Sequence, residues 1–146
     1  MRGVIQRVSQ ASVIIDKKKV ASINDGLLVL LGIEIQDTKE DARWLANKIS
    51  SLRIFSDKDG KMNRSVTEVN GEVIVVSQFT LHAKTKKGNR PSYIKASRPE
   101  HAIPLYEQFK KELSDVIGKE VQSGEFAADM KVSLTNDGPV TIIIDT

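Results

Sequence analysis

Apolar residues in the first part of the chain come in short runs that are typical of strands. Residues 13–15 and 20–23 are two such runs, and the polar residues 16–19 between them predict a turn. Residues 26–33 form a continuous apolar run with glycines near both ends. The length and composition of this run predict a strand that is buried on both faces.

The following segment changes from a strand period to a helical period. Thr38 is followed three residues later by Asp41, which approximates a capping box and predicts the start of a helix. Trp44 lies off the centre of the apolar stripe and indicates a contact beyond the core face of this helix. The stripe itself comprises Ala42, Leu45, Ala46, Ile49 and Leu52.

A second helix is predicted in the last third of the chain. Ser97 and Glu100 have the spacing of a capping box, with Pro99 in the first turn. Gly118 is a suitable residue to end the helix. Its predicted apolar face consists of Leu105, Tyr106, Phe109, Leu113, Val116 and Ile117.

The middle of the chain carries further signals for strands and turns. Residues 53–55 predict a short strand, and residues 56–60 predict a turn. Asn70-Gly71 lies between the apolar residues 66–69 and 73–76, which predicts a β-hairpin. We expect the second strand of this hairpin to continue through Leu81.

The C-terminal segment predicts strands at residues 131–135 and 140–144, with a turn at residues 136–139. The chain is therefore expected to be an α+β protein with a largely antiparallel sheet or open barrel and two main helices. Its 146 residues, 40% of them hydrophobic, fit one domain that spans residues 1–146.

Composition excludes several classes of protein. The chain has no cysteine, which excludes disulfides, thiolate catalysis and cysteine-bound zinc. The longest apolar run, residues 27–31, is too short to span a bilayer, and the polar residues among the first seven interrupt any signal-peptide core. We therefore expect a cytoplasmic protein without a membrane partner.

Positive charge is concentrated in one stretch. Residues 73–99 contain no Asp or Glu and carry six cations, so the rest of a chain with net charge +3 is acidic by three charges. Such a stretch fits a partner that carries phosphates, and it equally fits a solvated lysine-rich loop. The six cations are Lys84, Lys86, Lys87, Arg90, Lys95 and Arg98.

Most standard catalytic motifs are absent. There is no glycine-rich phosphate loop and no nucleophile elbow. His82 and His101 are the only histidines, and each is more typical of a surface or interface residue than of a metal ligand. We expect no metal and no cofactor.

Two segments are unusual for a plain scaffold. Ser77-Gln78-Phe79-Thr80-Leu81 places three polar side chains at a strand end, although a half-buried strand with a wet face would look the same. Asn136-Asp137-Gly138-Pro139-Val140-Thr141 has the composition of a tight turn. Pro139 makes a cis peptide accessible, and Gly138 can take backbone angles that other residues avoid.

Together and in this order, the two segments resemble the two signature motifs of the D-aminoacyl-tRNA deacylase family. The resemblance extends over the whole chain and includes no departure in either motif. Further matches in order and spacing are residues 5–8, 27–32, 53–57, 60–63 and 126–130.

The resemblance implies a cytoplasmic homodimer with active sites at the subunit interface. It implies hydrolysis of the ester between a D-amino acid and the terminal adenosine of tRNA. The Gly138-Pro139 peptide would be cis and would reach into the partner's site, where main-chain carbonyls exclude an L side chain. Glycyl-tRNA, which has no side chain to exclude, would be hydrolysed as well. Phe126, Met130 and Asn136 would contribute to substrate binding.

The resemblance also places catalysis at Ser77, Gln78, Phe79 and Thr80. Ester hydrolysis passes through an oxyanion, which main-chain donors around Phe79 and Thr80 would stabilise. Thr80 as a nucleophile would need a base. His82, two residues on and thus on the same strand face, lies outside the motif. The resemblance instead favours activation of water with help from the tRNA 2′-hydroxyl.

Two alternatives remain open from the sequence. One is a non-catalytic RNA-binding module in which the basic stretch is the only functional surface. The other is a related deacylase that prefers achiral or other mischarged substrates. Phe126 is also equally suited to filling the core.

Overall fold

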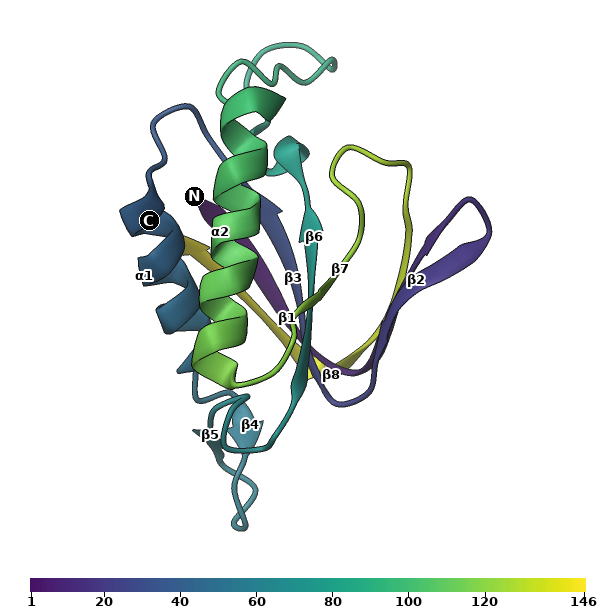
Figure 1. Cartoon of the computed structure of the whole chain (residues 1–146), viewed down its shortest axis with the longest axis vertical. Helices are drawn as coiled ribbons and strands as arrows, with labels where there is room; N and C mark the ends of the chain where they lie inside the picture. The colour runs from purple at the N-terminus through teal and green to yellow at the C-terminus, as the bar shows by residue number, and fades with distance from the viewer.

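The computed structural model describes residues 1–146 and has two helices packed side by side on one face of a curved sheet (Figure 1). The sheet follows the order β2-β1-β3-β6-β7, and β8 pairs with β1. None of the helices is both long and apolar enough to cross a membrane.

Strand β1 (Arg2–Ile15) organises the antiparallel part of the sheet. It pairs with β2 (Lys18–Ile23), β3 (Gly26–Gly32) and β8 (Lys131–Asp145), each time antiparallel. The turn between β1 and β2 is shorter than predicted. Only Asp16 and Lys17 form it, with φ of 47° and 66°, the positive values that a tight two-residue hairpin requires.

The hairpin predicted at Asn70-Gly71 is wrong. Residues 66–70 form a turn, closed by a bond of 2.8 Å from Gly71 N–H to Val66 O, and β6 (Glu72–Ser77) pairs in parallel with β3. The apolar pattern misled because Val66 is fully buried in the core without being in a strand. A short β7 (Gln122–Ser123) pairs in parallel with β6, so the sheet is mixed.

The two helices lie where the apolar periods place them. Helix α1 (Lys39–Ser50) begins with the predicted capping box, in which Thr38 N–H donates to Asp41 Oδ2 at 2.8 Å. Helix α2 (Pro99–Ile117) has Pro99 in its first turn and ends at Gly118, whose φ is 69°. Its predicted capping box is wrong, because Arg98 occupies the cap position and makes no side-chain cap bond.

Core residues lie on both faces of the sheet. The larger cluster joins the sheet to α1 and α2, and the smaller one fills the inside of the curved sheet between β1, β2, β3 and β6. Leu27 and Leu28 belong to opposite clusters and are both buried, which confirms that β3 is covered on two faces. Trp44 is 49% exposed on α1, and Val116 on α2 is also exposed.

Two smaller predictions differ from the structure in detail. Residues 53–55 contribute only Phe55 to β4 (Phe55–Ser56), which pairs with β5 (Met62–Arg64). Strand β8 is one continuous strand, whereas two strands and a turn were predicted. Residues 136–139 form an irregularity within it, where the register with β1 shifts between Gln6 and Gln10.

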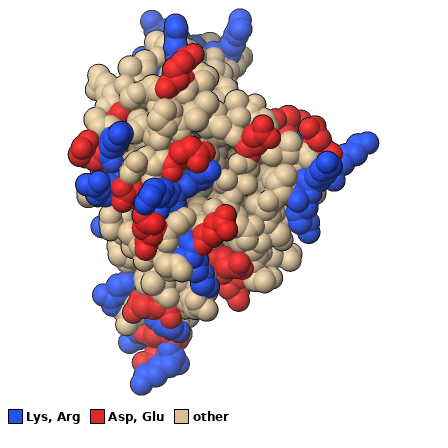
Figure 2. Space-filling model, viewed as in Figure 1, with Lys and Arg blue, Asp and Glu red and all other residues tan.

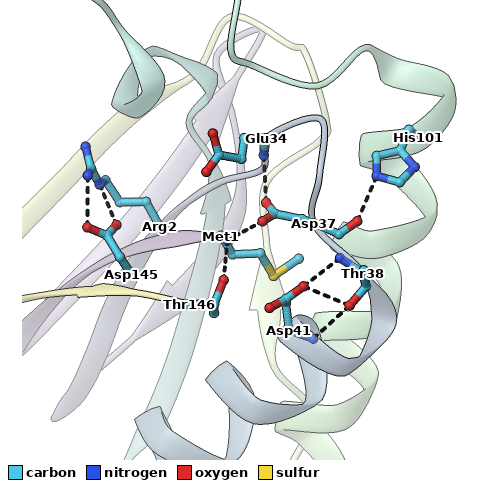
Figure 3. A network of polar contacts seen from close by, with 9 residues as sticks. All are labelled: Met1, Arg2, Glu34, Asp37, Thr38, Asp41, His101, Asp145 and Thr146. Carbon is cyan, nitrogen blue, oxygen red and sulfur yellow. Dashed lines mark hydrogen bonds and ion pairs between the residues drawn. The ribbon is translucent and has the colours of Figure 1, made fainter.

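The two ends of the chain lie close together beside α1 (Figures 1 and 3). The Met1 amino group pairs with the buried carboxylate of Asp37 and bonds Thr146 Oγ1 at 2.5 Å. Arg2 pairs with Asp145 at 2.6 Å and also donates to Leu81 O at 3.1 Å. These contacts hold β1 and β8 in place next to the segment that follows β6.

Candidate active site

A cleft of about 280 Å³ opens where β6 ends. Its lining includes Ser77, Gln78 and Phe79 of the first motif and residues 126–130, which precede β8. Leu31, Val76 and Ala102 are among the apolar residues that complete the lining. The first motif and the Phe126 segment, far apart in the sequence, therefore form one site.

The chain turns sharply at the first motif. Strand β6 ends at Ser77, and η1 (Phe79–His82) is a 3₁₀ helix, so the prediction of a strand through Leu81 is wrong. The first N–H groups of any helix lack an intrahelical partner. Accordingly, the N–H groups of Phe79 and Thr80 have no acceptor within the chain, and Gln78 provides no side-chain cap. Two consecutive main-chain donors are thus free at the edge of the cleft, whose lining includes Phe79 but not Thr80.

The Thr80 hydroxyl is paired with an amide and not with a base. Gln78 Nε2 donates to Thr80 Oγ1 at 2.5 Å. His82 was expected on the same strand face as Thr80, but a 3₁₀ helix has three residues per turn and separates the two. His82 was also expected to be a surface or interface residue, and within the chain it is only 9% exposed. It packs against Gly32, where a Cβ would lie 3.0 Å from the imidazole ring.

Phe126 lies where either role that the sequence left open is possible. It lines the cleft and also packs on Tyr106, with ring centroids 5.7 Å apart. Burial raises the pKa of Tyr106, whose hydroxyl donates to Val75 O at 2.9 Å. Tyr106 is therefore a neutral structural support behind the cleft. Met130 lines the cleft and fills the space left by Gly124, where a Cβ would lie 2.2 Å from its sulfur.

The second motif lies outside this cleft. Neither Asn136, Gly138 nor Pro139 is part of its lining, and both Gly138 and Pro139 are exposed. The Gly138-Pro139 peptide is cis. Asn136 Oδ1 accepts from Val140 N–H at 2.8 Å and holds the segment in its shape. Within one chain, the structure does not bring the two motifs together.

Arg7 holds the second motif and was not singled out from the sequence. It is 9% exposed, and its Nε donates to Asp137 O at 3.0 Å while Nη1 donates to Ile54 O at 2.5 Å. It also pairs with the Asp137 carboxylate at 3.2 Å. An arginine between Ile5 and Val8 in a strand was the available signal, because a buried cation requires partners.

Comparison with known proteins identifies the family of the chain over a range that includes both motifs. The family model described as D-Tyr-tRNA(Tyr) deacylase matches residues 4–145. A D-aminoacyl-tRNA deacylase of Flavobacterium psychrophilum is 67% identical over the whole chain and 97% of the relative. The chain belongs to the D-aminoacyl-tRNA deacylase family. The bond cleaved in deacylation of an aminoacyl-tRNA is a carboxylic ester, so this deacylase is an ester hydrolase.

Further matches are a second curated relative and two solved structures. A D-aminoacyl-tRNA deacylase of Akkermansia muciniphila is 65% identical over the same extent. Among solved structures, the c-Myc DNA Unwinding Element Binding Protein has a TM-score of 0.95 and 38% identity, with 100% of this deacylase and 99% of that chain covered. A probable eukaryotic D-amino acid tRNA deacylase has a TM-score of 0.86 at 18% identity and shares the fold.

Proposed function

We propose that this D-aminoacyl-tRNA deacylase cleaves the ester of its substrate in the cleft beside η1. The supporting observation is the pair of free N–H groups on Phe79 and Thr80. In this proposal both donate to the oxyanion that forms when water attacks the ester carbonyl. Preorganised donors of this kind are usually the largest contribution to catalysis of acyl transfer.

The proposed water activation relies on the substrate. Asp129 is the only titratable residue that lines the cleft, and it is exposed and pairs with Lys131 at 3.5 Å. We therefore assign the activation of water to the 2′-hydroxyl of the terminal adenosine. Ser77 and Gln78 position the ester, while Phe126 and Met130 contact the adenosine or the aminoacyl group. Neither a metal nor a cofactor has a role in this scheme.

Chiral selection is proposed to come from a second copy of the chain. Gly138 and Pro139 are exposed and lie outside the cleft of their own chain. In a homodimer, each chain would place this segment, together with Asn136, at the cleft of its partner. Main-chain carbonyls there would obstruct the side chain of an L-amino acid, whereas a D side chain points elsewhere. The substrate and the dimer both fit a cytoplasmic protein.

The direct test is hydrolysis of D-tyrosyl-, L-tyrosyl-, glycyl- and L-alanyl-tRNA by the purified protein. We expect release from the D-tyrosyl and glycyl substrates and refusal of both L substrates. Rapid hydrolysis of L-alanyl-tRNA, or refusal of glycyl-tRNA, would contradict the proposed selection. RNA binding without release of any amino acid would favour a non-catalytic RNA-binding module.

A variant separates main-chain from side-chain catalysis. Thr80→Ala keeps the N–H groups and removes the hydroxyl, so we expect substantial activity in single-turnover assays. A nucleophile acting with its base is indispensable, and its loss typically costs several orders of magnitude. A loss of that size in a folded variant would show that Thr80 is the nucleophile.

A further inference from the structure

An exposed aromatic pair lies at the rim of the cleft, where Phe79 belongs to the lining and Tyr93 lies just outside it. Phe79 is 56% exposed and Tyr93 is 38% exposed, and their rings meet edge to face with centroids 5.1 Å apart. Ile94, the next residue, is 69% exposed. We call Phe79, Tyr93 and Ile94 the aromatic ledge. An edge-to-face pair leaves ring surface free for a third planar group.

The main chain holds Tyr93 firmly beside the cleft. Lys84 and Ser92 exchange two backbone bonds of 2.8 and 3.0 Å just before it. Just after it, Ala96 N–H donates to Tyr93 O at 3.0 Å, and Ile35 N–H donates to Lys95 O at 3.3 Å. The loop is thus fastened on both sides of Tyr93, so the aromatic ledge is formed before any ligand arrives.

The same loop carries the basic stretch. Figure 2 shows Lys and Arg side chains at the top of the molecule, where Figure 1 places the loop between β6 and α2. None of the six cations takes part in an ion pair within the chain: Lys84, Lys86, Lys87, Arg90, Lys95 and Arg98. Their charge is therefore available to an anionic partner.

We propose that the aromatic ledge stacks the unpaired nucleotides that precede the terminal adenosine of the tRNA, while the cations of the loop hold their phosphates. This inference rests on the proposed function, which brings the terminal adenosine into the adjoining cleft. Aromatic side chains next to a basic groove are the usual means of binding single-stranded nucleic acid. Stacking of this kind tolerates any base, because every base has a π-face.

The first experiment compares two substrates that share the scissile ester. D-Tyrosyl-tRNA has the unpaired nucleotides, whereas D-tyrosyl-adenosine lacks them. Tyr93→Ala should lower kcat/KM for the tRNA roughly 5- to 100-fold and leave hydrolysis of the adenosine ester unchanged. Tyr93→Phe, which keeps the ring, should restore activity on tRNA. Equal losses on both substrates, or no loss on tRNA, would overturn the proposal.

Trp44→Ala provides the matched control. Trp44 is an aromatic residue on α1 with 49% exposure, outside the cleft and the basic loop. Its removal should leave kcat/KM unchanged for both D-tyrosyl-tRNA and D-tyrosyl-adenosine. The variants should unfold at the same Tm, because both side chains are exposed.

A binding measurement keeps this inference separate from the catalytic proposal. An RNA hairpin that carries no amino acid and has unpaired nucleotides at its 3′ end is compared with the same hairpin without those nucleotides. Tyr93→Ala should weaken binding of the first and leave binding of the second unchanged, whether or not the protein hydrolyses any ester. Equal effects on the two hairpins would overturn stacking by the ledge.

Discussion

The packing of His82 on Gly32 shows how one missing side chain shapes the proposed catalytic turn. His82 is buried at the end of η1, and its Nε2 has no hydrogen-bond partner. Gly32, at the end of β3, leaves the space that the imidazole occupies. The position of η1 therefore depends on Gly32, a residue of β3. The free N–H groups of Phe79 and Thr80 depend on it in turn.

Gly32→Ala should damage both stability and activity. The added Cβ would lie 3.0 Å from the His82 ring and 3.1 Å from Gln78 O, so η1 must shift. We expect a loss of about 1–3 kcal/mol in the free energy of unfolding, measured with urea, together with reduced kcat. Gly3→Ala is the control, because its nearest neighbour would be at 3.4 Å, an ordinary van der Waals distance. An active and stable Gly32→Ala variant would contradict this account.

Single residues of the site could be predicted only as members of a motif. The family resemblance singled out Ser77 to Thr80 and the Gly138-Pro139 peptide, but not the roles of Arg7 or His82. Arg7 supports the second motif from another strand, and its bonds to Asp137 and Ile54 join residues that are far apart in the sequence. No local pattern encodes interactions of this kind.

Among the elements, α1 has the cap that its sequence predicts. Thr38 and Asp41 exchange hydrogen bonds, and the bonds from Thr38 lower the pKa of Asp41 below its usual 3.8. A carboxylate whose pKa is lowered by folding contributes its full stabilisation at pH values above its pKa in the unfolded chain. This contribution is lost as the pH falls through its pKa in the folded protein.

Thr38→Ala should therefore cost about 1 kcal/mol of stability at neutral pH. The difference in the free energy of unfolding between variant and wild type should shrink as the pH falls below about 4. Asp41 then becomes protonated in both proteins and no longer stabilises the helix as a carboxylate. Chemical denaturation at a series of pH values measures this. Ser51→Ala, at the opposite end of α1, should give a difference with no such acid dependence. A Thr38→Ala defect that stays constant down to about pH 2 would contradict the assigned cause.

Helices were easier to predict than strand partners. Their caps and apolar periods are local, so the end at Gly118 could be predicted directly. Asn70-Gly71 correctly marked a change of direction, but the partner of β6 is β3, which is distant in the sequence. Residues 136–139 likewise have turn composition, yet the long pairing of β8 with β1 carries the strand through them.

For the molecule as a whole, the charge distribution makes a measurable prediction. Replacing Lys86, Lys87 and Arg90 by Gln should weaken tRNA binding and flatten its salt dependence, by roughly 0.7–0.9 in log–log slope for each phosphate that is no longer neutralised. Lys17, Lys18 and Lys19, at the tip of the β1–β2 hairpin, carry the same charge. Their replacement should leave the slope unchanged. Equal slopes for the two triple variants would show that the loop is not the tRNA surface.

The separation of the two motifs has a consequence for mixed populations of the protein. Suppose that a cell makes one intact chain and one chain damaged at residues 136–140. In a hybrid of the proposed dimer, the intact chain would receive the faulty segment and lose its accuracy. The damaged chain, with a sound cleft and a sound neighbour, would still proofread. Damage to this segment in one chain would thus impair the active site of the other chain.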